Sequence, residues 1–168
     1  MKKLLPVVFL ILISSFCFAD SKPTYNTYDN LSDILSKEFF GVAWGKKMPG
    51  GLTYKTIDAQ GIEIYTKNLS VRFRDIPISE VLFGFYKEKF CSADLRFLGR
   101  DNYEKIKQIL QSAEGGTFSE TPARGKVLTC SWLPSSPQPD QGSVTLLFDE
   151  TVGQGDLMFI NLKQDLKK

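Results

Sequence analysis

The side chains most often used in catalysis are missing from this sequence or stand too far apart to act as a known motif. The chain of 168 residues contains no histidine. This excludes, within this chain, a Ser-His-Asp triad, a Cys-His pair and any metal site built on histidine. Cys91 and Cys130 are too widely spaced for a C-x-x-C redox motif, and no G-x-x-x-x-G-K-[ST] phosphate loop is present. The sequence predicts a protein that is not an enzyme, with no cofactor and no metal.

Carboxylates are the remaining groups that could do chemistry. Asp149, Glu150 and Asp156 bracket the glycine-containing segment 153–155. They match a calcium loop weakly, because their spacing is not that of an EF-hand and acidic residues are common in hairpin turns. Two carboxylates could hydrolyse a sugar, but nothing in the sequence pairs any two of the 19 acidic residues. A carboxylate-dependent hydrolase is therefore the least favoured function.

The first residues have the pattern of a secretory signal peptide, Met1–Ala19. Lys2 and Lys3 form a positive start, Leu4–Ile13 is almost wholly apolar, and the sequence turns polar after Ala19. The apolar run is too short to anchor a chain stably in a membrane. We expect residues 1–19 to be removed, which gives a periplasmic or secreted protein with no stable membrane insertion after cleavage.

Signal removal also changes the charge. Loss of Lys2 and Lys3 lowers Lys+Arg from 21 to 19, which equals the 19 Asp and Glu. A neutral chain without a basic run is a poor partner for nucleic acid or for an anionic membrane surface. No nucleic-acid partner is therefore expected.

Two cysteines remain after cleavage, Cys91 and Cys130. In an oxidising compartment an even pair forms a disulfide more often than it stays as two free thiols. We predict a Cys91–Cys130 disulfide, which requires that the two Cα atoms come within about 7 Å of each other.

The elements that would position these residues centre on a β-hairpin, Val81–Tyr86 and Phe90–Leu98. In both segments small or apolar residues alternate with others at period two, which predicts strands with one buried face. A three-residue loop, Lys87–Lys89, would pair Phe85 with Cys91 and Phe83 with Ala93. That register places all the small and apolar residues on one face, so it is favoured over a two-residue loop.

An amphipathic helix is predicted directly after the hairpin, over Asp101–Ala113. Asp101 and Glu104 form a D-x-x-E capping pattern, and the glycines that follow the helix favour its end. An apolar stripe at helical spacing must be buried, and the apolar face of the hairpin is the nearest surface for it. The stripe consists of Tyr103, Ile106, Ile109, Leu110 and Ala113.

The rest of the chain supplies further strands. Those expected are Leu52–Asp58, Ile62–Lys67, Val71–Arg74, Lys126–Leu133, Ser143–Asp149 and Leu157–Leu162, with Thr117–Gly125 and Pro134–Gly142 as loops. Residues 20–37 form an N-terminal tether or a short helix, and residues 38–168 a single domain. The predicted fold is α+β: an antiparallel sheet of about six or seven strands with one main helix packed on one face.

The segment FFGVAWG resembles the F-x-G-I-x-W-G opening of a group of small exported bacterial proteins with no assigned activity. Phe39, Gly41, Trp44 and Gly45 occupy the fixed positions, and Val42 stands in the isoleucine position. The resemblance extends loosely over most of the mature chain. It implies a compact α+β domain and supplies no catalytic residue. From burial statistics alone, Phe39 and Trp44 are expected in the core.

Three functions follow in order of preference. The first is a non-catalytic interaction module of the bacterial cell envelope, such as an adaptor, a chaperone-like factor or an inhibitor, with another envelope protein as partner. The second is a carrier of a small hydrophobic ligand, with a pocket between sheet and helix. The third is the hydrolase. The sequence assigns no binding residue, and it is compatible with a monomer or a weak dimer formed through an edge strand.

Overall fold

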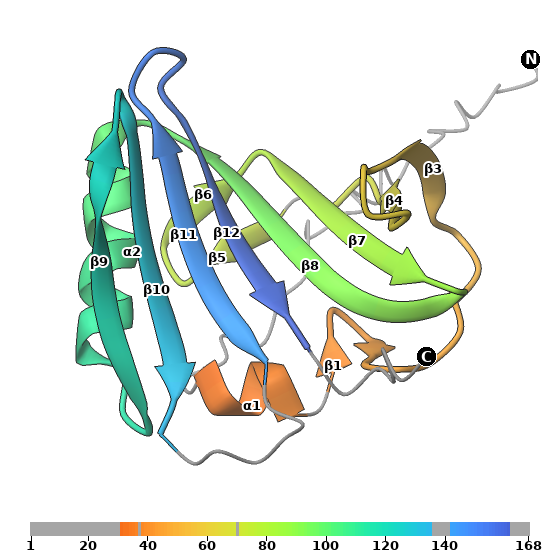
Figure 1. The fold of residues 1–168 in the computed structure, drawn as a ribbon. Coiled ribbons are helices and arrows are strands. Elements are labelled where there is room, and N and C mark those ends of the chain that lie inside the picture. The colour runs from red at the N-terminus through yellow and green to blue at the C-terminus, as the bar shows by residue number, and fades with distance from the viewer. Residues whose placement is uncertain (1–30, 37, 70, 136–141, 162–168) are drawn as a thin grey trace, which may run out of the picture.

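One antiparallel sheet of eight strands organises the protein (Figure 1). The computed structural model describes residues 31–36, 38–69, 71–135 and 142–161. The strands of the sheet are β3 (Thr53–Ile57), β4 (Glu63–Thr66), β7 (Glu80–Tyr86), β8 (Lys89–Leu98), β9 (Gly116–Arg124), β10 (Val127–Pro134), β11 (Ser143–Asp149) and β12 (Gln154–Ile160). Their order in space is β3-β4-β7-β8-β12-β11-β10-β9.

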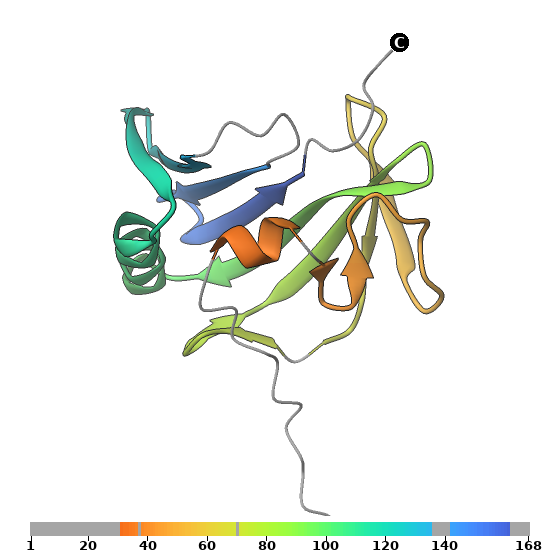
Figure 2. The ribbon, with the colours of Figure 1, turned by 90° about the horizontal axis from the view of Figure 1, so that it is seen from below.

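The smaller elements pack on one side of this sheet, which we call the core face (Figure 2). They are the helices α1 (Leu31–Ser36) and α2 (Arg100–Ser112), and two small hairpins, β1 (Glu38–Phe39) with β2 (Val42–Ala43) and β5 (Val71–Phe73) with β6 (Ile76–Ile78). Aromatic rings pack within the sheet and between the layers: Phe97 of β8 stacks on Phe148 of β11 at 6.4 Å between centroids, and Tyr103 of α2 lies 5.3 Å from the Phe148 ring. Burial of each such side chain contributes roughly 1.5–3 kcal/mol.

The predicted fold is confirmed in its main features. The sheet is antiparallel, and the main helix packs on one of its faces. The strand number is wrong, because the sheet has eight strands and not six or seven. The two helices are short, so the described part of the chain is mostly β, and an even mixture of helix and strand is not seen.

The main helix α2 carries the predicted apolar stripe but not the predicted cap. Tyr103, Ile106 and Leu110 are buried, and Ile109 and Ala113 pack against the core. The helix begins at Arg100, so Asp101 lies in its first turn and the N-cap residue is Gly99, which makes no side-chain cap bond. Glu104 accepts a hydrogen bond from Arg100 at 2.8 Å. The D-x-x-E cap is therefore wrong, because the helix starts one residue early.

The turn of the central hairpin is tighter than predicted. β7 ends at Tyr86 and β8 begins at Lys89, and these two residues pair. The loop is therefore Lys87-Glu88, and both residues have positive φ, 47° and 64°. Two positive φ values in a two-residue loop match the twist of the strands, although non-glycine residues rarely adopt them.

A β-bulge reconciles this short turn with the apolar pattern. Phe83 pairs with Ala93 as predicted, but Phe85 pairs with Phe90, so the Phe85–Cys91 pairing is wrong. Cys91 is the extra residue on β8. A bulge of this kind lets residues on both sides of it share one face while the bulged residue leaves that face. Phe90 and Ala93 thus both reach the core, and Cys91 does not join it.

Four strands were not predicted, β1, β2, β6 and β9, and for two of them the reasons differ. The expected loop Thr117–Gly125 is largely strand β9, an edge strand whose residues are mostly exposed, so its sequence has no apolar alternation. Strand β6 contains Pro77, which pairs with Arg72 of β5 in an isolated two-stranded sheet. Proline is tolerated there because a hairpin edge does not need its missing N–H group.

The segment between Phe39 and Gly45 has a structural role. Phe39 is 1% exposed and Trp44 8% exposed, which confirms that both belong to the core. Gly41 and Gly45 have positive φ, 78° and 76°, and Gly41 lies in the tight turn between β1 and β2. The motif therefore combines two aromatic core residues with two glycines in conformations that other residues adopt at a cost.

Two side chains satisfy the end of α1, the short helix allowed for in the sequence. The Trp44 indole donates to the Ile34 carbonyl at 2.7 Å, and the Asn161 amide donates to the Leu35 carbonyl at 2.7 Å. Carbonyls at the end of a helix lack partners within it, so these bonds offset a desolvation cost of about 1–3 kcal/mol each. These two bonds attach the end of α1 to the residues that directly follow β2 and β12.

Close packing between β8 and β12 depends on a residue without a side chain. Gly155 pairs with Phe97, and a Cβ atom at this position would overlap the Phe97 ring and lie 2.8 Å from the Leu147 carbonyl oxygen. Phe97 is fully buried, so its ring has no space for a change of rotamer. Gly155 therefore allows β12 to lie against the centre of the core.

We predict that Gly155→Ala lowers the free energy of unfolding by about 1–3 kcal/mol, because an overpacked core must distort. Urea denaturation measures the change. Gly50→Ala is the matched control: its Cβ would meet no atom within 4 Å, so a change below about 0.5 kcal/mol is expected. Equal stability of the two variants would contradict the β8–β12 packing.

Candidate functional site

A cavity of about 530 Å³ lies on the face of the sheet opposite α2, which we call the cavity face. Residues from β3, β4, β7, β8 and β12 line it. The β3–β4 end of the sheet turns out of the plane of β11 and β12, so the curved sheet itself encloses the space (Figure 2). The lining residues are Lys55, Thr56, Asp58, Gln60, Ile62, Ile64, Leu82, Gly84, Tyr86, Cys91, Ser92, Ala93, Asp94, Arg96, Met158, Ile160 and Asn161.

Cross-strand register arranges the floor of the cavity in rows. Asp94 of β8 lies between Leu82 of β7 and Met158 of β12. The next row places Ser92 between Gly84 and Ile160. Residues that pair across antiparallel strands share a face, so these side chains form one continuous surface. Apolar side chains therefore flank the only carboxylate of the two rows.

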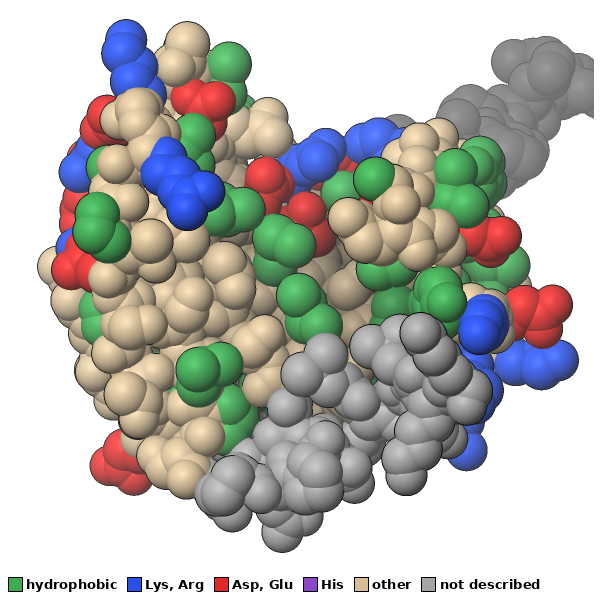
Figure 3. Space-filling view, in the orientation of Figure 1, with side chains coloured by type: hydrophobic (Ala, Val, Ile, Leu, Met, Phe, Trp, Pro, Cys, Tyr) green, Lys and Arg blue, Asp and Glu red, His purple; other side chains and the backbone are tan. Residues whose placement is uncertain are grey.

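Glycine at position 84 makes room in this floor for the Ser92 hydroxyl. A Cβ atom there would overlap the Ser92 hydroxyl and lie 3.0 Å from a methyl carbon of Ile62. On the cavity face, hydrophobic side chains lie below a cluster of acidic and basic ones in the upper middle of the view (Figure 3).

The β3–β4 hairpin forms one wall. Its turn is held by Asp58, whose Oδ1 accepts hydrogen bonds from the backbone N–H groups of Gln60 (2.9 Å) and Ile62 (2.8 Å). This Asx turn engages the Asp58 carboxylate in local structure. Ile62 and Ile64 line the cavity, as the alternation in the sequence predicts for a shared face.

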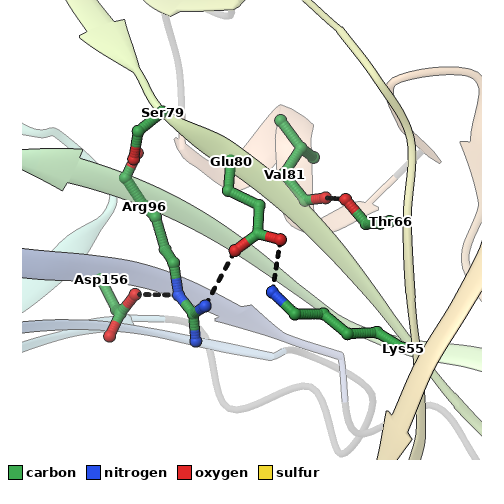
Figure 4. A network of polar contacts seen from close by, with 7 residues as sticks. All are labelled: Lys55, Thr66, Ser79, Glu80, Val81, Arg96 and Asp156. Carbon is green, nitrogen blue, oxygen red and sulfur yellow. Dashed lines mark hydrogen bonds and ion pairs between the residues drawn. The ribbon is translucent and has the colours of Figure 1, made fainter.

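A row of four charged residues closes one end of the cavity (Figure 4). Arg96 lies in register between Glu80 and Asp156 and binds both, at 2.8 Å through Nη1 and at 3.0 Å through Nε. Lys55 of β3 reaches across to the other oxygen of Glu80. The row links β3, β7, β8 and β12.

The charged row affects the pKa values of its own side chains more than it affects the stability of the fold. Burial acts to raise the pKa of Glu80, but the hydrogen bonds and charges of Lys55 and Arg96 outweigh it and lower that pKa. All four side chains are part-exposed, and such pairs contribute only about 0–1 kcal/mol each. Two positive and two negative charges leave the row neutral.

Asp94 stands outside this neutral row. Its Oδ1 atom is buried and accepts no hydrogen bond from any residue within the described ranges. Burial, then the negative charge of Asp156, raises the pKa of Asp94 from 3.8 to about 7, and the charge of Arg96 opposes this only in part. The Asp94 carboxyl group therefore changes its protonation state near neutral pH, whereas an ordinary surface aspartate is already ionised there.

The bulge places Cys91 at the edge of the same cavity. Its thiol donates to the Gly84 carbonyl at 3.4 Å, and its side chain is 8% exposed. Burial raises the pKa of the Cys91 thiol, so it is largely protonated at neutral pH and a weak nucleophile.

The predicted Cys91–Cys130 disulfide is wrong for the structure, in which both residues are free cysteines. β12 and β11 lie between β8 and β10, so the two cysteines are separated by at least three strand spacings, about 14 Å. They also lie on opposite faces: Cys91 lines the cavity, whereas Cys130 lies in the core with its Sγ 3.2 Å from the Tyr103 hydroxyl. A disulfide cannot span that gap.

The acidic residues near segment 153–155 do not converge. Asp149 accepts a hydrogen bond from the Thr151 N–H at 2.7 Å, Glu150 pairs with Arg100, and Asp156 pairs with Arg96. Among the described residues, no group of three or more His, Cys, Asp or Glu side chains could hold a metal ion. None of the helices in the described ranges is long and apolar enough to cross a bilayer. The predicted signal peptide lies outside the described residues.

Sequence reasoning placed a possible pocket between sheet and helix, but large side chains fill that space. The cavity lies on the other face, where Ser92, Asp94 and Arg96 look like an ordinary solvent side. One feature of the sequence could have indicated a covered second face: strand β7 is apolar at Leu82 as well as on its core face. In the structure, all residues of β7 except those at its ends are buried.

Comparison of the chain with protein-family models, with curated proteins and with solved structures finds no significant match.

We predict that the chain lacking residues 1–19, purified without reductant and then unfolded, has two reactive thiols, one of which is lost in Cys91→Ser. In the folded protein both thiols should react at least about tenfold more slowly with a disulfide reagent, because both are buried. Absence of any reactive thiol after unfolding would contradict the separation of the two cysteines.

Proposed function

We propose that the protein is a non-catalytic binder of small, largely apolar ligands, exported to the periplasm or beyond the cell. The observation that carries this proposal is the cavity of about 530 Å³ on the cavity face. Small-molecule sites have volumes of about 300–1,000 Å³, with mainly apolar walls and a few polar groups that fix the orientation of the ligand. The cavity has this composition.

The lining supports a carrier more than a catalyst. Isoleucine, leucine and methionine side chains supply apolar contact, and Asp94 supplies one polar group in their midst. Hydrolysis by carboxylates needs two of them free to act on one bond. The two carboxylates whose charges raise the pKa of Asp94, Asp156 and Glu80, are both bound by Arg96.

Export supports the same proposal. The predicted signal peptide and the lack of histidine agree with an envelope component that binds and releases a ligand without changing it. The resemblance to small exported bacterial proteins points to the same compartment. We therefore favour the second of the three functions expected from the sequence, with its pocket moved to the other face of the sheet.

A protein-interaction module remains the second candidate because of β9. This strand ends the sheet, and no described strand pairs with its outer side. An open edge can accept a strand from another envelope protein or from a second copy of the chain. Pro122 lies within β9 and interrupts the row of N–H donors, which limits such pairing.

The test uses N-phenyl-1-naphthylamine, a neutral apolar dye that fluoresces when it leaves water. We predict saturable binding to the wild-type protein and at least a tenfold loss of affinity in Met158→Trp, because the larger ring fills the floor of the cavity. The matched control is Leu133→Trp, which places the same ring at a position that is 52% exposed and outside the cavity.

Equal dye binding by Met158→Trp and wild type would show that the dye binds elsewhere. Absence of saturable binding to the wild type would contradict the carrier function and leave the edge of β9 as the candidate site.

A further inference from the structure

The charges around the cavity do not cancel. Lys55 and Arg96 are the positive residues of the lining, and both are engaged by Glu80, with Asp156 as a second partner of Arg96. The four charges form a neutral row at one end. No cation is left over within this row to neutralise Asp94.

Among the described residues, the other neighbours of Asp94 offer no compensation for its charge. The residues directly beside it across the strands are Leu82 and Met158, which are apolar. Asp58, the other acidic residue of the lining, uses its Oδ1 for two backbone N–H groups of its own turn. Asp94 is thus the one carboxyl of the lining that is flanked by apolar side chains and left outside the ion pairs of the described residues.

We infer that the ligand is an apolar molecule with a single positive charge, such as a lipophilic primary amine, whose ammonium group binds Asp94 while its apolar part lies between the β3–β4 hairpin and β12. This inference rests on the proposed function and names the chemical class of the ligand. It follows from charge complementarity: an ammonium group would supply both the missing charge and the missing hydrogen-bond donor.

The space beside Asp94 suits such a group. Ser92 lies two residues along the same strand, on the same face, and its hydroxyl oxygen can accept a second ammonium hydrogen. Gly84, opposite Ser92, has no side chain, and the Ser92 hydroxyl occupies the space where its Cβ atom would lie. Ile62, Ile64 and Ile160 then provide the apolar contact for the body of the ligand.

The charged residues in and beside the cavity also disfavour an anionic ligand. The cavity and its charged end contain four acidic groups, Asp58, Glu80, Asp94 and Asp156, against two basic ones. The two cations are already held in ion pairs, so a carboxylate or phosphate would have to displace Glu80 or Asp156 to reach them.

Binding should strengthen as the pH rises through neutrality. An ammonium group attracts ionised Asp94 and not the protonated acid, whose pKa is about 7 in the free protein. The charged groups that face Asp94 are Lys55 from β3, Glu80 from β7, Arg96 from β8 and Asp156 from β12, which hold one another in ion pairs. A neutral ligand has no reason to follow this titration.

The experiment compares two ligands of the same shape, 4-phenylbutylamine and 4-phenyl-1-butanol, by isothermal titration calorimetry at about pH 8.5 and about pH 5.5. The amine stays protonated at both values. We expect the amine to bind at least about tenfold more tightly than the alcohol at the higher pH, and less than about threefold more tightly at the lower pH.

Asp94→Asn removes the charge and keeps the shape of the side chain. It should abolish the advantage of the amine at the higher pH and leave alcohol binding unchanged, whereas the control Glu114→Gln, an exposed carboxylate outside the cavity, should behave as wild type. If Asp94→Asn does not fold, the pH dependence of the wild-type protein decides alone.

The two proposals fail in different ways. Alcohol binding without any preference for the amine at the higher pH would overturn the inferred ligand class and leave the cavity as a binding site. An amine preference that persists in Asp94→Asn would overturn the role of Asp94. Absence of binding by the dye and by both ligands would overturn the proposed function itself.

Discussion

The dominant constraint on the cavity face is an acidic side chain placed between two apolar neighbours. Leu82 and Met158 flank Asp94 in register, so the carboxyl loses water without gaining a charged partner among the residues that the structure describes. One row away, Arg96 has a carboxylate on each side and leaves no charge to spare. The same strand alternation thus produces a neutral ionic row and an isolated acid in adjacent positions.

The rest of the fold keeps this arrangement in place. A core of aromatic and aliphatic residues on the opposite face fixes β7, β8 and β12 against α2 and α1, which sets the register of the cavity rows. The bulge at Cys91 lets β8 change which residues face the core, and the Asp58 turn holds the β3–β4 wall. The cavity is therefore built mainly by the strands of the sheet, together with the turn between β3 and β4.

Much of the fold could be predicted from periodicity, and less of the site. The stripe of α2, the core position of Trp44, and the strands of the β3–β4 and β11–β12 hairpins follow from local patterns. β9 could not be predicted because an exposed edge strand needs no apolar residues, and the Cys91 bulge because alternation alone allowed a longer loop. The separation of Cys91 from Cys130 depends on strand order, which local patterns do not contain.

The most direct measurement is the titration of Asp94 itself, by the carbon-13 shift of its carboxyl group, with Asp94→Asn used to assign the signal. A carboxyl isolated among apolar side chains should titrate with a midpoint of about 7. A midpoint near 3.8, the ordinary value, would mean that Asp94 is hydrated or paired with a cation, and would contradict the account of the cavity.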